Sequence, residues 1–203
     1  MKLIGNHRKP DKTEELARQC AVALRNRYGD GEKWAATFNP SRQAEVARNI
    51  PAVFSDTTIP SLVRSAYAFG RNKVETWLSL QLATIVAVEG ERTTVTPESL
   101  MGIARDLLSV PDFRTLRPTD IMLFCVQFRT GQYGKIYGRL NTMDICAALR
   151  EFCRWRQMQL DRAERERERQ QRLEHEKTAI TWEQYCAIKG LNPDDNPLKL
   201  KPE

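Results

Sequence analysis

The chain has 203 residues, of which 41% are hydrophobic and 29% charged, and its formal net charge is +6. This length allows one domain with a real core, or a domain with an appendage. The basic residues at 7–9 follow the N-terminus so closely that the chain has no apolar segment typical of a signal peptide there. No later apolar segment is long enough to span a bilayer. We therefore expect a cytoplasmic protein without a membrane partner.

The positive charge is concentrated in two stretches. Residues 1–50 carry 10 Lys and Arg against 6 Asp and Glu, and residues 111–160 carry 8 against 4. Residues 51–110 and 161–203 each have a net charge of −1. A basic excess placed in this way suits an acidic partner, first of all a nucleic acid.

The cysteines and histidines indicate neither a disulfide framework nor a metal site. The five cysteines are an odd number, are widely spaced and contain no Cys-x-x-Cys pair. We interpret them as reduced thiols, most of them on apolar helix faces. The two histidines, His7 and His175, lie in charged segments and supply too few ligands for zinc. No cofactor is expected.

The N-terminal half predicts short helices. Residues 1–11 form a flexible basic arm in this interpretation, and the spacing of Leu16 and Cys20 predicts a helix over 12–28 that ends at Gly29. Proline positions predict further helices near 40–49 and 60–69. We interpret residues 53–59 between them as a connection, because their β-branched side chains have no partner strand elsewhere.

Two longer helices follow. Apolar residues cover more than one face of 72–88, which predicts a helix central to a bundle. Thr96 and Pro97 then form a helix start, with a buried stripe from Leu100 to Leu108. Helix follows helix with short links, so the sequence predicts an all-α fold, a compact orthogonal helical bundle over residues 12–160.

The most informative stretch is 116–160. An almost wholly apolar run over 121–128 predicts a buried helix with Pro118 in its first turn. It leads into a loop rich in glycine and tyrosine, 130–139, whose glycines allow a tight, shaped turn. Asn141 is expected to cap the following helix.

The C-terminal part changes character. The apolar stripe of the helix after Asn141 fades beyond Leu160, and residues 161–178 carry alternating charges at i,i+3 and i,i+4, which predicts a charged, solvated helix projecting from the bundle. A minority interpretation is dimerisation through this segment. Within 179–203, Thr181 and Gln184 have the spacing of a capping box, so we expect a short helix closed by Gly190 and then an irregular tail.

Motifs of catalysis are absent from the sequence. It contains no phosphate-binding Gly-x-x-x-x-Gly-Lys-[Ser/Thr], no His-Glu-x-x-His and no Gly-x-Ser-x-Gly. Asp112, Asp120 and Asp144 could in principle cluster around Mg²⁺, but helix capping explains the last two more simply. We therefore expect a protein that is not an enzyme.

The loop and its flanks also carry a resemblance. Residues 116–121, 128–139 and 148–152, with the core Gly-x-Tyr-Gly-Lys-x-Tyr, resemble an uncharacterised family of small helical proteins from bacterial prophages and other mobile elements. The resemblance covers about a quarter of the chain. It implies a mobile-element setting and assigns no catalytic residue.

The first functional hypothesis is DNA binding by the loop and the helix after it. Tyrosine rings can stack on bases, and Lys and Arg side chains can neutralise phosphates. The alternative is structural, with the tyrosines folded back on the core and the glycines simply making the turn. The candidate nucleic-acid-binding residues are Arg129, Tyr133, Lys135, Tyr137, Arg139, Arg150 and Arg154.

The second hypothesis is a protein-interaction adaptor. Trp182, Tyr185 and Ile188 share one face of the short C-terminal helix and are candidate partner-binding residues, unless this helix packs on its own bundle. Together the two hypotheses describe an accessory factor that holds DNA and recruits a replication or recombination protein. The alternative is a helical adaptor with no nucleic-acid contact.

Overall fold

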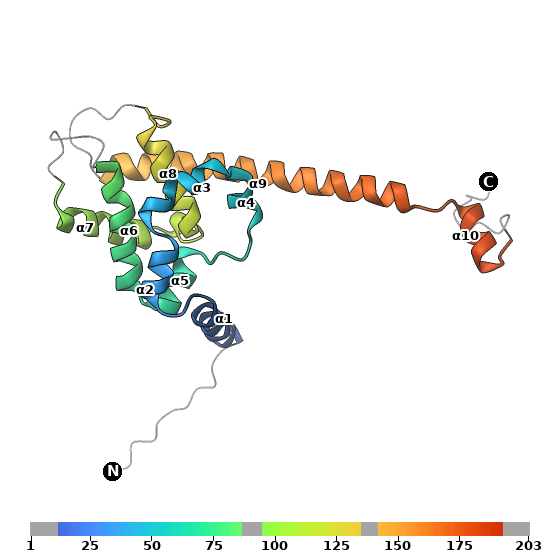
Figure 1. The fold of residues 1–203 in the computed structure, drawn as a ribbon, viewed down its shortest axis with the longest axis horizontal. Coiled ribbons are helices and arrows are strands. Elements are labelled where there is room, and N and C mark those ends of the chain that lie inside the picture. Colours follow the sequence, from blue (N-terminus) through green and yellow to red (C-terminus); the bar gives the residue numbers. More distant parts are fainter. Residues whose placement is uncertain (1–11, 87–94, 135–141, 193–203) are drawn as a thin grey trace, which may run out of the picture. The chain divides into compact units, whose positions relative to one another are not determined.

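The computed structural model describes residues 12–86, 95–134 and 142–192, and all regular secondary structure in these ranges is helical (Figure 1). The prediction of an all-α fold is confirmed. The chain divides into two compact units, Met1–Gln159 and Leu160–Glu203. No helix within the described ranges is both long and apolar enough to cross a membrane. The predicted N-terminal arm, the expected cap Asn141 and the tail beyond residue 192 lie outside these ranges.

Short helices make up the N-terminal part of the first unit. In chain order they are α1 (Lys12–Tyr28), α2 (Gly31–Thr37), the 3-10 turn η1 (Pro40–Arg42), α3 (Gln43–Arg48), α4 (Ile50–Ser55) and α5 (Leu62–Phe69). Helix α2 starts directly after α1 because the Asp30 carboxylate accepts hydrogen bonds from the backbone N–H groups of Glu32 and Lys33. The Gly29 turn therefore separates two helices, with φ at +76° in the region that glycine adopts easily.

The interpretation of residues 53–59 as a connection is wrong over its first part. Asn49 caps α4 by accepting a hydrogen bond from the Ala52 N–H, and the helix runs through Val53 and Phe54 to Ser55. Both Val53 and Phe54 are buried, and the Phe54 ring lies edge-on to Trp155 at 5.7 Å between centroids. Tertiary burial thus overrides the weak helix preference of a β-branched segment.

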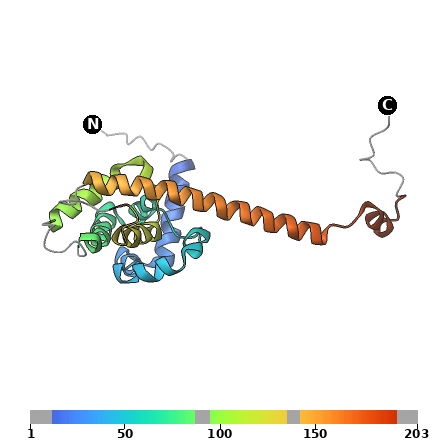
Figure 2. The same ribbon diagram turned by 90° about the horizontal axis from the view of Figure 1, so that it is seen from above.

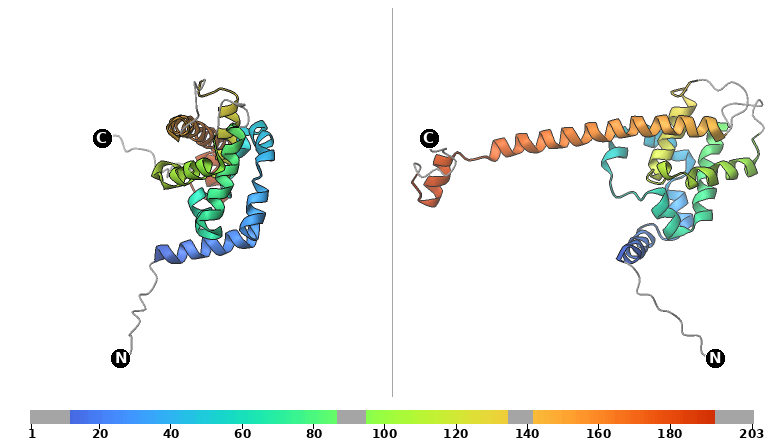
Figure 3. Two further views of the ribbon diagram at one scale, coloured as in Figure 1. Left: turned by 90° about the vertical axis from the view of Figure 1, so that its left-hand side faces the viewer. Right: turned by 180° about the vertical axis from the view of Figure 1, so that it is seen from behind.

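Helix α1 has the predicted bounds but buries little of its surface. It packs against α5 and lies across one end of the bundle (Figure 3). Among its residues only Ala21 is buried, and Leu16, whose spacing helped to predict the helix, is 62% exposed. Helical spacing thus predicted the helix correctly, but it did not show how much of the helix the core covers.

The core is built on α6 (Arg71–Val86), α7 (Pro97–Ser109), the 3-10 turn η3 (Pro111–Phe113) and α8 (Pro118–Arg129). Helix α6 contacts α5, α7, α8 and α2, as its apolar residues on several faces predicted. Seen from above, α8 is viewed almost end-on, between α9 on one side and the N-terminal helices on the other (Figure 2). Its residues from Pro118 to Cys125 are all buried.

Helix α9 (Thr142–Thr178) contributes to both units. Within the first unit, Ile145, Leu149 and Phe152 are fully buried, and the Phe152 ring meets Phe124 of α8 at 5.7 Å. The sequence predicts eight large apolar side chains in the core, and all eight are buried: Trp77, Leu82, Ile85, Leu107, Phe124, Phe128, Leu149 and Phe152.

The second unit contains the rest of α9 and α10 (Trp182–Lys189). From Glu164 to Thr181 every side chain is exposed, so this stretch is helical without a buried face. Helix α10 has the predicted capping box, in which Gln184 N donates to Thr181 Oγ1 and Thr181 N donates to Gln184 Oε1. Gly190 ends it with a left-handed φ of +67°.

Candidate nucleic-acid and partner interfaces

The start of the Gly/Tyr loop is tied to the core by Tyr133. Its hydroxyl donates a hydrogen bond to Gln127 Oε1 at 2.5 Å, and its ring lies 5.6 Å from that of Phe124. Gly131 and Gly134, on either side, have φ of +80° and +86°, a region that other residues rarely adopt. Burial raises the pKa of Tyr133 well above its usual value, so the hydroxyl remains a donor.

Tyr133 therefore has the structural role that the sequence left open as an alternative to base stacking. Lys135, Tyr137 and Arg139 lie outside the described residues. On the far side of the loop, α9 begins at Thr142 and buries Ile145 one turn later. The described residues on both flanks of the loop are thus fixed against the same core.

Arg129 lies at the end of α8 and takes part in a buried polar network. Its Nη1 donates to Gln43 Oε1 at 2.6 Å, and Gln43 Nε2 donates to Gln81 Oε1 at 2.7 Å. Gln81 Nε2 in turn donates to the carbonyl of Phe38, which also accepts from Trp77 Nε1. This network joins α8, α3, α6 and the end of α2, so Arg129 supports the loop from within the bundle.

Arg150 and Arg154 are exposed on α9, one helical turn apart. They follow the loop in the chain and come from the same helix whose opposite side buries Leu149 and Phe152. Of the predicted nucleic-acid-binding residues that the structure describes, Arg129 and Tyr133 bind core residues, whereas Arg150 and Arg154 face solvent. They form a short basic strip on α9. In the chain this strip follows Ile145, the buried residue that fixes the C-terminal flank of the loop.

A buried charge cluster lies at the start of α8, and sequence reasoning assigned Asp120 only as a helix cap. Asp120 has no exposed surface, and its Oδ2 accepts from the Arg117 backbone N–H at 2.8 Å. The same oxygen lies 3.3 Å from Arg117 Nε and 2.9 Å from Arg156 Nε of α9. The cluster joins α9 to α8. The Arg-Pro-x-Asp sequence at the start of α8 could have indicated the pairing of Arg117 with Asp120. No sequence pattern indicated that Arg156 also contacts Asp120.

In the second unit the candidate partner-binding residues form an aromatic pair with an apolar neighbour. The rings of Trp182 and Tyr185 stack at 5.6 Å, and the Ile188 side chain is 70% exposed. Exposed Ile180 and Leu191 lie just before and after this helix. Short amphipathic helices with such exposed anchors are a common mode of docking into another protein's groove.

The thiols of Cys125 and Cys153 lack the environment of a catalytic nucleophile. Burial raises the pKa of Cys125 to about 12 and that of Cys153 to about 11. A reactive cysteine needs the opposite change, a lowered pKa that favours the thiolate. Within the described residues, no His, Cys, Asp and Glu side chains gather in a group able to hold a metal ion.

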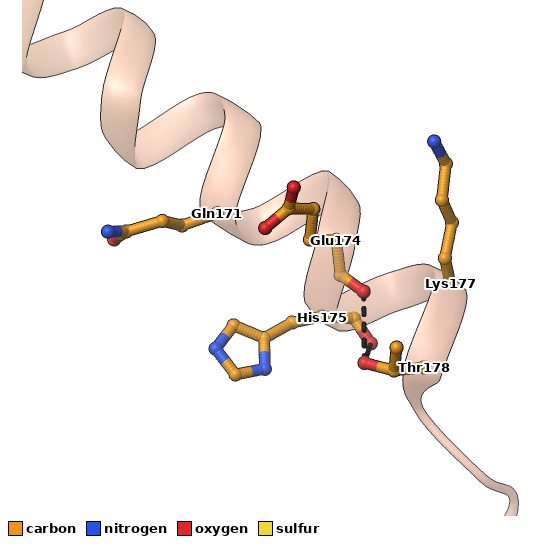
Figure 4. A pocket seen from close by; sticks show the side chains of 5 residues that line it. All are labelled: Gln171, Glu174, His175, Lys177 and Thr178. Carbon is orange, nitrogen blue, oxygen red and sulfur yellow. Dashed lines mark hydrogen bonds between the residues drawn. The ribbon is translucent and has the colours of Figure 1, made fainter.

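A cavity of about 350 Å³ lies along the last turns of α9 (Figure 4). Its side chains, Gln171, Glu174, His175, Lys177 and Thr178, leave one helix in different directions. The Thr178 hydroxyl donates to the backbone carbonyls of Glu174 and His175, which is ordinary for the end of a helix. The described residues of this lining are therefore all exposed positions at the end of one helix.

One protein family matches part of the chain. A model of a family of unknown function, DUF6633, matches residues 101–196, just under half of the chain. The match starts within α7 and includes α8, both flanks of the loop, α9 and α10. No curated protein and no solved structure matches. The chain is therefore similar, over its C-terminal half, to proteins whose activity is not established.

Proposed function

We propose that this protein is a non-enzymatic, DNA-associated accessory factor that binds DNA through the Gly/Tyr loop and the start of α9, and a second protein through α10. The main support for DNA binding is that Arg150 and Arg154 are both exposed on α9. They follow a loop whose two flanks are fixed to the core by Tyr133 and Ile145. Fixed flanks lower the entropy lost when a basic loop meets its ligand.

The charges of the loop region support a phosphate partner. Lys135 and Arg139 come from the loop in sequence, and Arg150 and Arg154 lie on the helix after it. Lys and Arg side chains that neutralise phosphates release counterions, which provides sequence-independent affinity. In this proposal Tyr137 is the stacking residue, while Tyr133 and Arg129 hold the loop in place from the core side.

The setting proposed for this activity is a phage or another mobile element, as the loop resemblance implies. The second binding function rests on Trp182, Tyr185 and Ile188, for which a replication or recombination protein is the proposed partner. One family match covering both the loop flanks and α10 supports the idea that the two parts act together. The raised pKa values of Cys125 and Cys153 argue against a nucleophilic role for these two thiols.

A salt titration of DNA binding tests the proposal. Fluorescence anisotropy with a labelled DNA duplex and a labelled single strand, measured across salt concentrations, should give a linear fall of log affinity with log salt. Lys135→Ala and Arg139→Ala should each weaken binding uniformly across sequences and lower the salt slope by about one. Arg150→Gln with Arg154→Gln should lower it by about two.

The matched control changes two arginines in the charged stretch of α9. Arg165→Gln with Arg169→Gln removes the same charge from exposed positions of the same helix. This control should bind almost as tightly as the natural chain. Equal losses in both double variants would show a net-charge effect, and unchanged binding in all four variants would remove the DNA-binding proposal.

The second candidate function is a protein adaptor without nucleic-acid contact, and the observation that favours it is the exposure of Ile188 on α10. Tests of recruitment separate the two candidates. Ile188→Glu should abolish binding of a replication or recombination protein from the same element and leave DNA affinity unchanged. Lys189→Ala, at the neighbouring position of α10, is the control, because it leaves Trp182, Tyr185 and Ile188 in place and should not change recruitment.

A further inference from the structure

A cavity of about 250 Å³ lies in the first unit where several short elements meet. It opens between the ends of α1 and α2, the start of α3, the α4–α5 linker and the first turns of α8. Its lining residues are Arg27, Tyr28, Thr37, Phe38, Arg42, Val46, Asp56, Ile59, Thr119 and Met122. None of these residues takes part in the proposed DNA or protein interfaces.

The floor of the cavity is apolar and its rim is polar. Phe38 and Met122 are buried, and Val46 and Ile59 are half-buried. The Tyr28 ring completes this surface at 5.8 Å from Phe38. A mainly apolar lining with a few polar groups is the usual composition of a small-molecule site.

The wall formed by the α4–α5 linker is fixed by two arginines. Arg117 Nη1 donates to the Asp56 carbonyl at 2.6 Å, and Arg27 Nη1 donates to the Thr58 carbonyl at 3.1 Å. The Asp56 carboxylate accepts from both the backbone N–H and the hydroxyl of Thr58. A loop held in this way offers a preformed wall, which reduces the ordering cost of binding.

The polar groups of the cavity favour a negatively charged ligand. Arg42 is paired with Glu45, whereas Arg27 forms no ion pair with a described residue. Hydrogen bonds from Thr58 lower the pKa of Asp56, so this carboxylate is charged and already engaged. Arg27 lies over the Tyr28 ring at 5.2 Å and holds the Thr58 carbonyl through Nη1, so the N–H groups of its guanidinium that are not bonded to Thr58 are the donors left to pair with a ligand.

A second observation points to the same cavity. Thr119 is 92% buried in the first turn of α8, and its hydroxyl has no hydrogen-bond partner in the part of the chain that the structure describes. Buried hydroxyl groups are nearly always hydrogen-bonded in folded proteins. The hydroxyl oxygen is closed to solvent, so a ligand atom in the cavity would become its partner only once the Thr119 side chain turns toward it.

We propose that this cavity binds a small anionic ligand that consists of one ring-sized apolar body and one acidic group. The apolar body would lie on Phe38, Val46 and Met122, and the acidic group would pair with Arg27. A volume of about 250 Å³ is below the range of roughly 300–1,000 Å³ typical of drug-sized ligands, which limits the occupant to a single ring with a short chain.

The probe pair for this site is 3-phenylpropionate and 3-phenyl-1-propanol, which share the apolar body and differ in charge. Methyl NMR of the full chain should show shifts at Val46, Ile59 and Met122 with both probes. The acid should bind about tenfold more tightly than the alcohol. Arg27→Gln should remove this preference while both probes still bind.

Three further variants keep the test decisive. Val46→Phe fills the cavity and should abolish binding of both probes, and Ile59→Phe serves if the first variant unfolds. Arg48→Gln, an exposed arginine of α3 that does not line the cavity, should leave the preference unchanged. Leu16 and Val63 line a separate cavity between α1 and α5. Equal affinity for acid and alcohol, no shifts at millimolar probe, or shifts confined to Leu16 and Val63 would overturn the proposal.

Discussion

The first unit and the second unit of this chain are both helical, but different interactions hold their helices. In the first unit, hydrogen bonds join residues far apart in sequence, such as Gln43 to Gln81 and Arg117 to Asp56. In the second, the described contacts are local, such as Gln170 to Glu166 and the capping box of Thr181. Helicity alone therefore does not tell whether a segment belongs to a core.

Ion pairs show the same difference. Asp120 is fully buried and lies 2.9 Å from Arg156, whereas Glu168 and Arg172 are 3.9 Å apart with side chains more than half exposed. A buried charge depends strongly on its partner, while water screens an exposed pair. Substitutions should consequently have large effects in the first unit and small ones in the second.

The largest effect is expected for Phe124→Ala. Phe124 is fully buried, and its ring contacts those of Phe128, Tyr133 and Phe152. Loss of this side chain should lower the free energy of unfolding by about 3–5 kcal/mol, as measured by urea denaturation. Leu173→Ala, at an exposed position of α9, should change it by less than about 0.5 kcal/mol. A near-neutral Phe124 variant would contradict the core assigned here.

Asp120→Asn should have an effect of similar or slightly smaller size. It leaves the guanidinium groups of Arg117 and Arg156 buried without a counter-charge, which typically costs about 3–5 kcal/mol. The same denaturation experiment on Glu168→Gln provides the exposed control, for which we expect a change within about 0.5 kcal/mol. Similar losses in the two variants would mean that burial does not distinguish these pairs.

Tyr133→Phe should cost about 1 kcal/mol, because it removes the donor to Gln127 Oε1 and leaves the ring contacts in place. Thermal denaturation measures this change, and Tyr67→Phe, at an exposed position of α5, is the control. If Tyr133 instead stacks on bases, the variant would keep its stability, and Tyr133→Ala would reduce DNA affinity more than stability.

The smallest effect on the bundle is expected for deletion of residues 179–203. If α10 docks on another protein, the melting temperature should change by less than about 2 °C while recruitment of the partner is lost. Differential scanning calorimetry and a binding assay with the partner would measure the two quantities. A fall of several degrees would show that α10 packs on the bundle and is not free to bind.

Much of the fold was predictable because local signals and packing agree. Pro118 starts α8, and seven of the eight residues from Ile121 to Phe128 are buried, as the apolar character of this run predicted. The capping box of α10 depends on residues three apart, so sequence alone located it. Helix α4 was missed because its helical state depends on the burial of Val53 and Phe54 against distant residues such as Trp155.

The candidate sites were predictable only as residue types. The sequence by itself determined that the chain is helical, that its basic residues cluster near the Gly/Tyr loop and that Trp182, Tyr185 and Ile188 share one face of α10. Tertiary structure alone decided that Tyr133 and Arg129 point into the core, that Asp120 meets Arg156, and that Arg27 and Thr119 share a cavity. The physical reason is that periodicity and caps depend on neighbours in the chain, whereas a buried polar partner depends on which helices pack together.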